Sequence, residues 1–146
     1  MREIKFKGWC EKDSEWRYGF YITDGKVHEI NTMLKSGSFY ASQVDVESVG
    51  QYTGLKDKNG TEIYEGDIVK AFSVFDMTYD YSFEKDNDPK TLYQISFDDG
   101  CFQFKGVKQW SDGSNDWRSI ENVELFKVEV IGNIYENPEL IKGASQ

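Results

Sequence analysis

The histidine and the cysteines of this chain are the residues best suited to covalent chemistry, and they are few. His28 is the only histidine, and Cys10 and Cys101 are the only cysteines. A cysteine hydrolase needs a histidine held beside its nucleophile, and no nucleophile motif surrounds Cys10. One histidine and two separated cysteines also lack the ligand spacing of a zinc site. We therefore predict no catalytic residue, no metal site and no cofactor, and we expect both cysteines to be buried free thiols.

Carboxylates are the second group that could do chemistry. Glu65 and Asp67 lie two residues apart, so in a strand they would share a face and could bind a divalent metal or separate their pKa values. Asp98 and Asp99 form another pair. Each pair adjoins a glycine, and turn or bend formation explains both without a reaction. We favour the turns and keep a divalent-metal-dependent hydrolase as an alternative.

Aromatic residues are candidates for binding. They make up 16% of the chain, and five of them gather between residues 9 and 21, with Lys5, Lys7 and Arg17 nearby. Such a group can stack on nucleic-acid bases or contact a protein, although core packing is the commoner use. A second group lies in an acidic segment, 76–90, where tyrosines alternate. The predicted interaction residues are Trp9, Trp16, Tyr21, Tyr79, Tyr81, Asp86 and Asp88.

The elements that must position these residues are organised around the stretch 51–69. Asn59-Gly60 lies between two apolar runs, which is a strong signal for a tight hairpin turn. Asp57 can accept a hydrogen bond from the backbone N–H two residues on. Gly66 stands between two acids just before Ile68, which indicates a bend that leads into a new strand. We predict a hairpin whose return strand bends at Gly66.

Alternating apolar residues and turn signals predict short strands elsewhere. Asp99-Gly100 predicts a second tight hairpin, Asp116 a helical N-cap, and Gly132 a bulge. The polar segment 31–43 is predicted to be a loop with a fragment of strand near Phe39 and Tyr40. The expected strands are 4–8, 16–22, 27–30, 43–52, 67–75, 92–97, 101–107 and 126–135, with one helical turn at 118–122.

Three stretches carry a resemblance to a known family. QYTGLKDKNGTEIYEGDIVK in the middle, REIKFKGW at the start and EVIGNIYENPEL near the end resemble the YopX-like family of phage and prophage proteins. The resemblance implies a compact, mostly β fold with a small SH3-like barrel, very little helix and a phage setting, and it brings no catalytic residues. We expect one YopX-like domain over 1–146. Its parts are an N-terminal β-meander layer at 1–50, a barrel at 51–142, a variable insertion at 76–90 and a frayed tail at 143–146.

The composition limits the partners. With 17 Lys and Arg against 26 Asp and Glu, the net charge is −9, which opposes binding to DNA, RNA or an anionic membrane. The first residues lack the apolar stretch of a signal peptide, and no apolar run approaches the ~20 residues of a membrane span. We therefore expect a protein of the host cytoplasm.

These observations favour one function over two others. The first hypothesis is a phage- or prophage-encoded, non-catalytic protein-interaction module that binds a host or phage protein. The alternatives are a nucleic-acid binder or acidic nucleic-acid mimic, and the metal-dependent hydrolase. Exposed strand edges also make self-association into a homo-oligomer an expectation to test.

Overall fold

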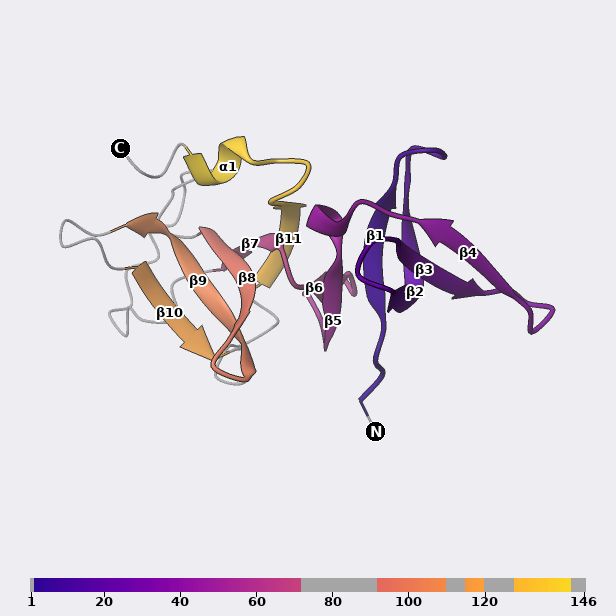
Figure 1. The fold of residues 1–146 in the computed structure, drawn as a ribbon. Coiled ribbons are helices and arrows are strands. Elements are labelled where there is room, and N and C mark those ends of the chain that lie inside the picture. The colour runs from indigo at the N-terminus through magenta and orange to yellow at the C-terminus, as the bar shows by residue number, and fades with distance from the viewer. Residues whose placement is uncertain (1, 72–91, 110–114, 120–127, 143–146) are drawn as a thin grey trace. The chain divides into compact units, whose positions relative to one another are not determined.

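The computed structural model describes residues 2–71, 92–109, 115–119 and 128–142 (Figure 1), with residues 108, 109 and 115–119 described by their backbone alone. The chain divides into two compact units, Met1–Gly54 and Leu55–Gln146. The described strands form two antiparallel sheets, and within the described residues these sheets do not close into a barrel. The prediction of a mostly β fold with very little helix is confirmed.

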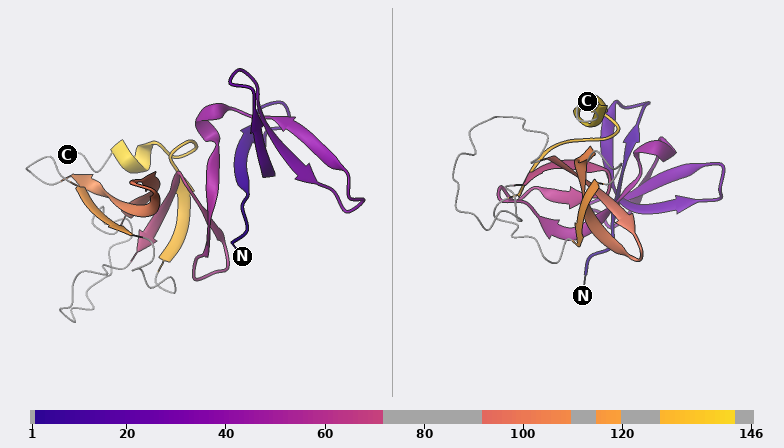
Figure 2. Two further views of the ribbon diagram at one scale, coloured as in Figure 1. Left: turned by 60° about the horizontal axis from the view of Figure 1, so that its bottom comes forward. Right: turned by 90° about the vertical axis from the view of Figure 1, so that its left-hand side faces the viewer.

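The first sheet has the strand order β4-β3-β2-β1-β5-β6; β4 to β1 and the start of β5 belong to the N-terminal unit, and β6 (Glu62–Tyr64), the neighbour of β5, belongs to the C-terminal unit. The β1–β2–β3 meander confirms the prediction for the first thirty residues, although β3 runs further than expected. The predicted loop at 31–43 instead holds the end of β3 and the whole of β4, the outer strand of this sheet (Figure 2). The strands are β1 (Phe6–Cys10), β2 (Glu15–Thr23), β3 (His28–Met33), β4 (Phe39–Gln43) and β5 (Gly50–Lys56).

The strand predicted at 43–52 is wrong over its first half. A 3₁₀ turn, η1 (Val46–Ser48), precedes β5 there. Asp45 caps this turn, because its side-chain oxygen accepts a hydrogen bond from the Glu47 N–H at 3.0 Å. Val44 is buried, whereas Val46 is 48% exposed, so the alternating valines do not share one face of a strand. A local cap outweighed the period-two pattern.

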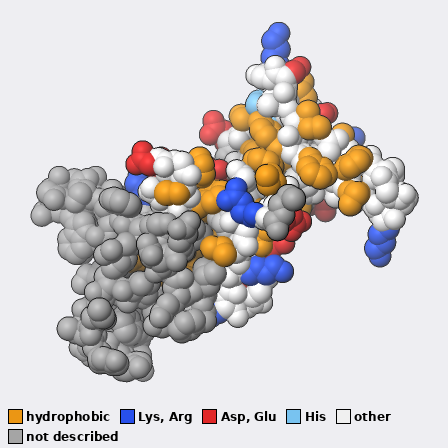
Figure 3. Space-filling model, turned by 90° about the horizontal axis from the view of Figure 1, so that it is seen from below, with side chains coloured by type: hydrophobic (Ala, Val, Ile, Leu, Met, Phe, Trp, Pro, Cys, Tyr) orange, Lys and Arg blue, Asp and Glu red, His pale blue; other side chains and the backbone are white. Residues whose placement is uncertain are grey.

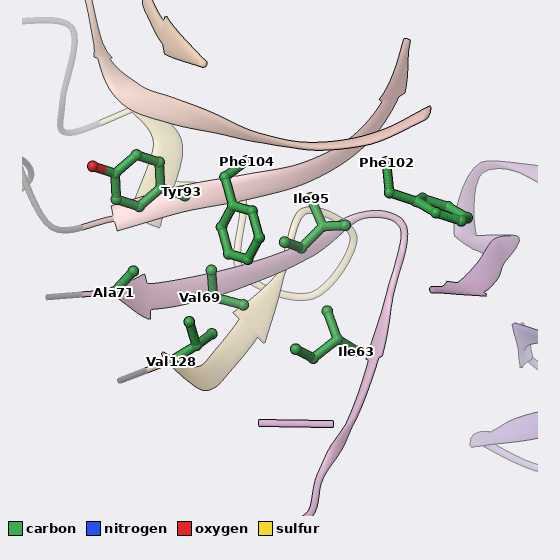
Figure 4. Packing of buried hydrophobic residues seen from close by; sticks show 8 residues of the cluster. All are labelled: Ile63, Val69, Ala71, Tyr93, Ile95, Phe102, Phe104 and Val128. Carbon is green, nitrogen blue, oxygen red and sulfur yellow. The ribbon is translucent and has the colours of Figure 1, made fainter. Parts of the chain in front are cut away.

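The C-terminal unit contains a five-stranded sheet in the order β10-β9-β8-β7-β11. Eight buried apolar residues form its core: Ile63, Val69, Ala71, Tyr93, Ile95, Phe102, Phe104 and Val128 (Figure 4). The elements are β6 (Glu62–Tyr64), β7 (Asp67–Ala71), β8 (Leu92–Asp98), β9 (Cys101–Gln109), β10 (Asn115–Ser119), β11 (Val128–Asn133) and α1 (Glu139–Lys142).

One predicted element of this unit is wrong and two are confirmed. Residues 118 and 119 of the predicted helical turn lie in the strand β10, where Arg118 pairs with Phe104 of β9, and residues 120–122 lie outside the described residues. The hairpin between β8 and β9 turns at Asp99 and Gly100, whose φ angles are both positive, as a two-residue turn of this kind requires. The register of β11 shifts between Val130 and Gly132, which confirms the bulge.

The organising hairpin is held by the carboxylate of Asp57. One side-chain oxygen accepts hydrogen bonds from the N–H groups of Asn59 and Thr61, at 2.8 and 2.9 Å. The other accepts from the N–H of Val130 in β11 at 2.9 Å. Gly60 follows Asn59 with φ 81°, in the left-handed region that glycine adopts easily. The predicted turn is confirmed, and Asp57 also ties it to a strand 73 residues away.

These hydrogen bonds determine the acidity of Asp57. The side chain is only 7% exposed. Burial by itself raises the pKa of this carboxyl, but its three backbone donors outweigh burial and leave the pKa below the ordinary value of 3.8. Asp57 is therefore a buried anion whose partners are backbone N–H groups of its own unit.

Candidate interaction surface

The strand β2 presents a row of exposed apolar side chains. Tyr18, Phe20 and Ile22 alternate along it and are 47%, 52% and 54% exposed. Side chains two residues apart in a strand lie on the same face of the sheet. The solvent-facing side of β2 is therefore aromatic and aliphatic instead of polar.

The neighbouring strands continue this row. Residues directly opposite each other in an antiparallel pair share a face. Phe20 faces Asn31 of β3, which faces Ala41 of β4, and Met33 faces Phe39. Met33 is 64% exposed and Phe39 is 55% exposed, and the rings of Phe20 and Phe39 are 5.9 Å apart. In the view of Figure 3, hydrophobic side chains gather on the part of the molecule at the upper right. We call the set the aromatic face: Tyr18, Phe20, Ile22, Met33 and Phe39.

The core of this unit occupies the opposite side of the same strands. Tyr21 faces Ile30 across β2 and β3, and Ile30 is fully buried with Cys10 and Val44. Phe6 packs against this cluster with its ring 5.5 Å from that of Tyr21. The small core thus lies on one side of this sheet, and the aromatic face lies on the other side, toward solvent.

Two cations near the aromatic residues of β2, Lys7 and Arg17, already have partners. The Lys7 ammonium lies over the Trp16 ring at 4.8 Å, and Lys7 is only 7% exposed. Arg17 bonds the carboxylates of Asp13 and Glu15 at 2.6 and 2.7 Å. The hydrogen bond from Arg17 holds the pKa of Asp13 below its ordinary value. Lys7 and Arg17 are therefore both engaged by groups of the protein itself.

The predicted interaction residues fall into two sets. Trp9 and Trp16 are half-buried and pack edge to face, with ring centroids 5.6 Å apart. Tyr21 lies on the core side, where it stacks on His28 and its hydroxyl shares a 2.6 Å hydrogen bond with Nδ1 of that histidine. The predicted contacts Tyr79, Tyr81, Asp86 and Asp88, with the insertion 76–90, lie outside the described residues. The roles of all seven stay predictions.

Sequence reasoning included Tyr18 and Phe20 in its aromatic group but missed Ile22, Met33 and Phe39. Met33 and Phe39 fall in the segment expected to be a loop, and only their pairing in β3 and β4 brings them beside β2. The signal that could have found them is Phe39-Tyr40, the aromatic pair already noted there as a fragment of strand.

The carboxylate pairs are parts of turns. Asp67 is 2% exposed, and its side-chain oxygen accepts a hydrogen bond from the Tyr64 N–H at 2.8 Å, across the bend at Gly66. Gly66 donates to the carbonyl of Ile95 and accepts from the N–H of Ile134, both at 2.8 Å. Within the part of the chain that the structure describes, no three metal-ligating side chains come together. Asp67 therefore holds the bend between β6 and β7.

The thiols and the histidine are also engaged separately. Both cysteines are free; the prediction of a buried thiol is confirmed for Cys10 and wrong for Cys101, which is partly exposed. The Cys10 thiol donates to Asp13 at 3.5 Å, whereas His28 bonds Tyr21. This arrangement does not form a nucleophile and base pair. Of the helices in the described ranges, none is long and apolar enough to cross a membrane.

The stretch EVIGNIYENPEL contains the end of β11 and the turn that follows it, and the side chain of Asn133 holds this turn. Asn133 is 7% exposed, and its side-chain oxygen Oδ1 accepts hydrogen bonds from the N–H groups of Tyr135 and Glu136, at 3.0 and 2.8 Å. A side chain at Gly132 would collide with that of Asn137. Asp57, Asp67 and Asn133 thus each use a buried oxygen to fix a turn.

Comparison with known proteins agrees with these signature stretches. The family model described as YopX protein matches residues 5–142. A relative from Bacillus subtilis (strain 168), the SPbeta prophage-derived uncharacterized protein YopX, is 33% identical over 84 residues. That match covers 58% of this chain and 53% of the relative, so this chain spans about half the relative's length.

A solved structure has a similar fold. The crystal structure of protein EF1440 from Enterococcus faecalis matches over 97% of this chain and 99% of that chain, with a TM-score of 0.52 and 24% identity. At this identity the likeness concerns the fold alone. The family match runs through the stretches of Asp57, Asp67 and Asn133, and it covers nearly the whole sequence: the chain belongs to the YopX family.

Proposed function

We propose that this chain is a phage- or prophage-encoded protein-interaction module without catalytic activity, which works in the host cytoplasm and binds a host or phage protein through the aromatic face. The observation that carries this proposal is the exposure of Tyr18, Phe20 and Ile22 on one side of β2, continued by Met33 and Phe39.

Exposed apolar groups of this kind favour a protein partner. Isolated surface hydrophobics are common, but contiguous ones mark interaction sites. Tyrosine, phenylalanine and methionine are enriched at the centres of protein interfaces, whereas lysine and the acidic residues are depleted there. The aromatic face follows this composition, because all five of its side chains are uncharged.

Charge separates this proposal from the nucleic-acid alternative. Affinity for nucleic acid comes largely from Lys and Arg that meet phosphate. Residues 1–54 hold seven Lys and Arg against eight Asp and Glu, so their net charge is −1. Lys7 and Arg17 are also already bound to a ring and to two carboxylates. An apolar protein surface suits this face better than a phosphate backbone.

The proposal also includes a phage or prophage origin for the protein and an SH3-like barrel in the C-terminal unit. The printed name of the Bacillus subtilis relative is that of a prophage protein, which supports a phage or prophage origin here. The C-terminal sheet is a four-strand meander, β7 to β10, whose first strand pairs with the last strand, β11. This order and the bulge at Val130 and Gly132 support a partly open barrel of the SH3-like kind.

A capture experiment tests the proposal. The wild-type protein, Phe20→Lys and Val46→Lys are each used to recover partners from phage-infected host cells, with quantitative mass spectrometry. Phe20 lies on the aromatic face, and Val46 is a control of similar exposure on η1. We expect Phe20→Lys to lose a partner that the other two proteins recover, because a buried lysine in an interface is costly.

Two results would contradict the proposal. One is recovery of the same partners by all three proteins. The other is direct binding to oligonucleotides that weakens steeply with salt and is unaffected by Phe20→Lys, which would point to the nucleic-acid alternative.

A further inference from the structure

The strand β4 forms one edge of the N-terminal sheet. It stands first in the strand order, and among the described strands only β3 pairs with it. The Val44 N–H bonds the His28 carbonyl, and the Leu34 N–H bonds the Ser38 carbonyl. Antiparallel pairs alternate, so the even-numbered residues of this segment bond β3. The outward backbone groups of β4 therefore belong to Phe39, Ala41 and Gln43.

The strand β4 lacks the features that usually prevent an edge strand from pairing with another chain. Proteins usually block such edges with charged residues, proline or a bulge. The strand β11, an edge of the other sheet, carries Glu129 and the bulge at Gly132. The residues of β4 are Phe-Tyr-Ala-Ser-Gln, and their register with β3 is regular. Four of the five are exposed, and none is charged.

We propose that β4 pairs with β4 of a second copy of this chain, antiparallel and about a two-fold axis at Ala41. In this register Ala41 faces its own copy, and Phe39 faces Gln43 of the second copy. All the outward backbone groups of the strand are then paired, in about six hydrogen bonds. A register shifted by two residues would leave some of them without a partner.

The charges beside β4 suit this pairing. A residue on a two-fold axis meets itself, so the axis tolerates no charge, and Ala41 is small and neutral. Lys35 precedes β4 and Glu47 follows it, each six residues from Ala41. An antiparallel partner places Lys35 of one copy at the end of the strand where Glu47 of the other lies. Both residues are exposed, so each end of the interface brings one positive and one negative side chain together.

Pairing at this edge extends the sheet without covering the aromatic face. Phe39 and Ala41 have their side chains on the same face as Phe20, and in the dimer this face runs on into the second copy. The dimer would present two aromatic faces in one continuous sheet, which allows bivalent binding. The dimer does not depend on the proposed function, because the edge can pair whether or not the face has a partner.

The experiment measures the mass of the wild-type protein by light scattering over a range of concentrations. We expect a dimer with twice the 16.9 kDa of one chain. The first variant is Ala41→Pro, which removes an outward N–H and leaves the bonds to β3 in place. We expect this variant to remain folded and monomeric. A monomeric wild-type protein at every concentration would overturn the proposal, as would an unchanged Ala41→Pro dimer.

Two charge variants distinguish loss of strand pairing from a folding defect. Ala41→Lys or Ala41→Glu places like charges opposite each other at the axis, and we expect each to weaken the dimer by about tenfold or more. When the two variants are mixed, opposite charges meet and the dimer should return as a heterodimer. A mixture that stays monomeric, or single variants that stay dimeric, would place the contact elsewhere. Partner capture by a monomeric Ala41→Pro protein separates this result from the proposed function.

Discussion

The two units of the molecule differ in what they bury. The core cluster of the C-terminal unit holds eight buried apolar residues, whereas the cluster of the N-terminal unit holds three, and five large apolar side chains lie exposed on its aromatic face. The charges differ as well. Residues 55–146 have ten Lys and Arg against 18 Asp and Glu, a net charge of −8, compared with −1 for residues 1–54.

The side chains that fix turns in the C-terminal unit differ in kind from those of the aromatic face. Two of the three stretches in which this chain resembles the family contain Asp57, Asp67 and Asn133, and each of these side chains fixes a turn of the C-terminal unit. Buried polar groups that accept backbone N–H groups are expensive to lose, which explains their use as anchors. These three side chains therefore help to build the C-terminal unit, whereas the surface that we propose as an interface lies in the N-terminal unit.

The largest expected effect is in the C-terminal core. Ile63 is fully buried among Val69, Ile95 and Val128. Ile63→Ala should reduce the free energy of unfolding by about 2–5 kcal/mol, because it removes buried methyl groups and leaves a cavity. Urea denaturation followed by tryptophan fluorescence and circular dichroism measures this change. A loss below about 1 kcal/mol would show that this core is loosely packed and would remove the contrast between the units.

The second effect tests the anchor at Asp57. Asp57→Ala leaves three backbone N–H groups without their acceptor, and we expect a loss of roughly 3 kcal/mol in the free energy of unfolding. Asp98→Ala is the control, because Asp98 is an exposed acid near another hairpin turn. Equal effects of the two substitutions in denaturant titrations would mean that Asp57 acts only as a surface charge.

The parts that could be predicted from the sequence depend on neighbouring residues. Asn59-Gly60 and Asp99-Gly100 specify their turns by the φ angles that these residues accept, and Gly132 marked the bulge in β11. Asp57 was correctly expected to accept a hydrogen bond two residues on. Its bond to Val130 could not be expected, because it joins residues 73 positions apart.

The wrong or incomplete predictions have non-local causes. Asp116 has the type of an N-cap, but pairing with β9 makes its segment a strand. In β2, Phe20 and Tyr21 are both aromatic, so the pattern alone does not tell which side is core. The answer comes from Ile30 and Cys10, which the register places on the side of Tyr21. The candidate surface could be predicted as an aromatic group, and its extent required the pairing of β3 and β4.

A smaller effect concerns pH. Hydrogen bonds keep the pKa of folded Asp57 below its ordinary value of 3.8. The stability that this carboxylate contributes is therefore complete above that value and is lost as the pH falls through the lower folded pKa. The difference in unfolding free energy between the wild type and Asp57→Asn should shrink on acidification from about pH 6 to about pH 2. A difference that is constant over this range would show that the Asp57 charge is unimportant.

The smallest expected effect is on the aromatic face, and it decides whether the two units differ as described. Phe20→Ser removes a ring that is 52% exposed, and we expect the free energy of unfolding to change by about 0.5 kcal/mol or less. The control is Ile30→Ala, on the opposite side of the same sheet, where the side chain is fully buried and a loss of about 2 kcal/mol or more is expected. If Phe20→Ser destabilised the protein as much as Ile30→Ala, the aromatic face would be part of a core. A near-neutral Phe20→Ser with a destabilising Ile30→Ala would mean that Phe20 contributes little to folding, which leaves binding as the physical reason for an apolar side chain at this position.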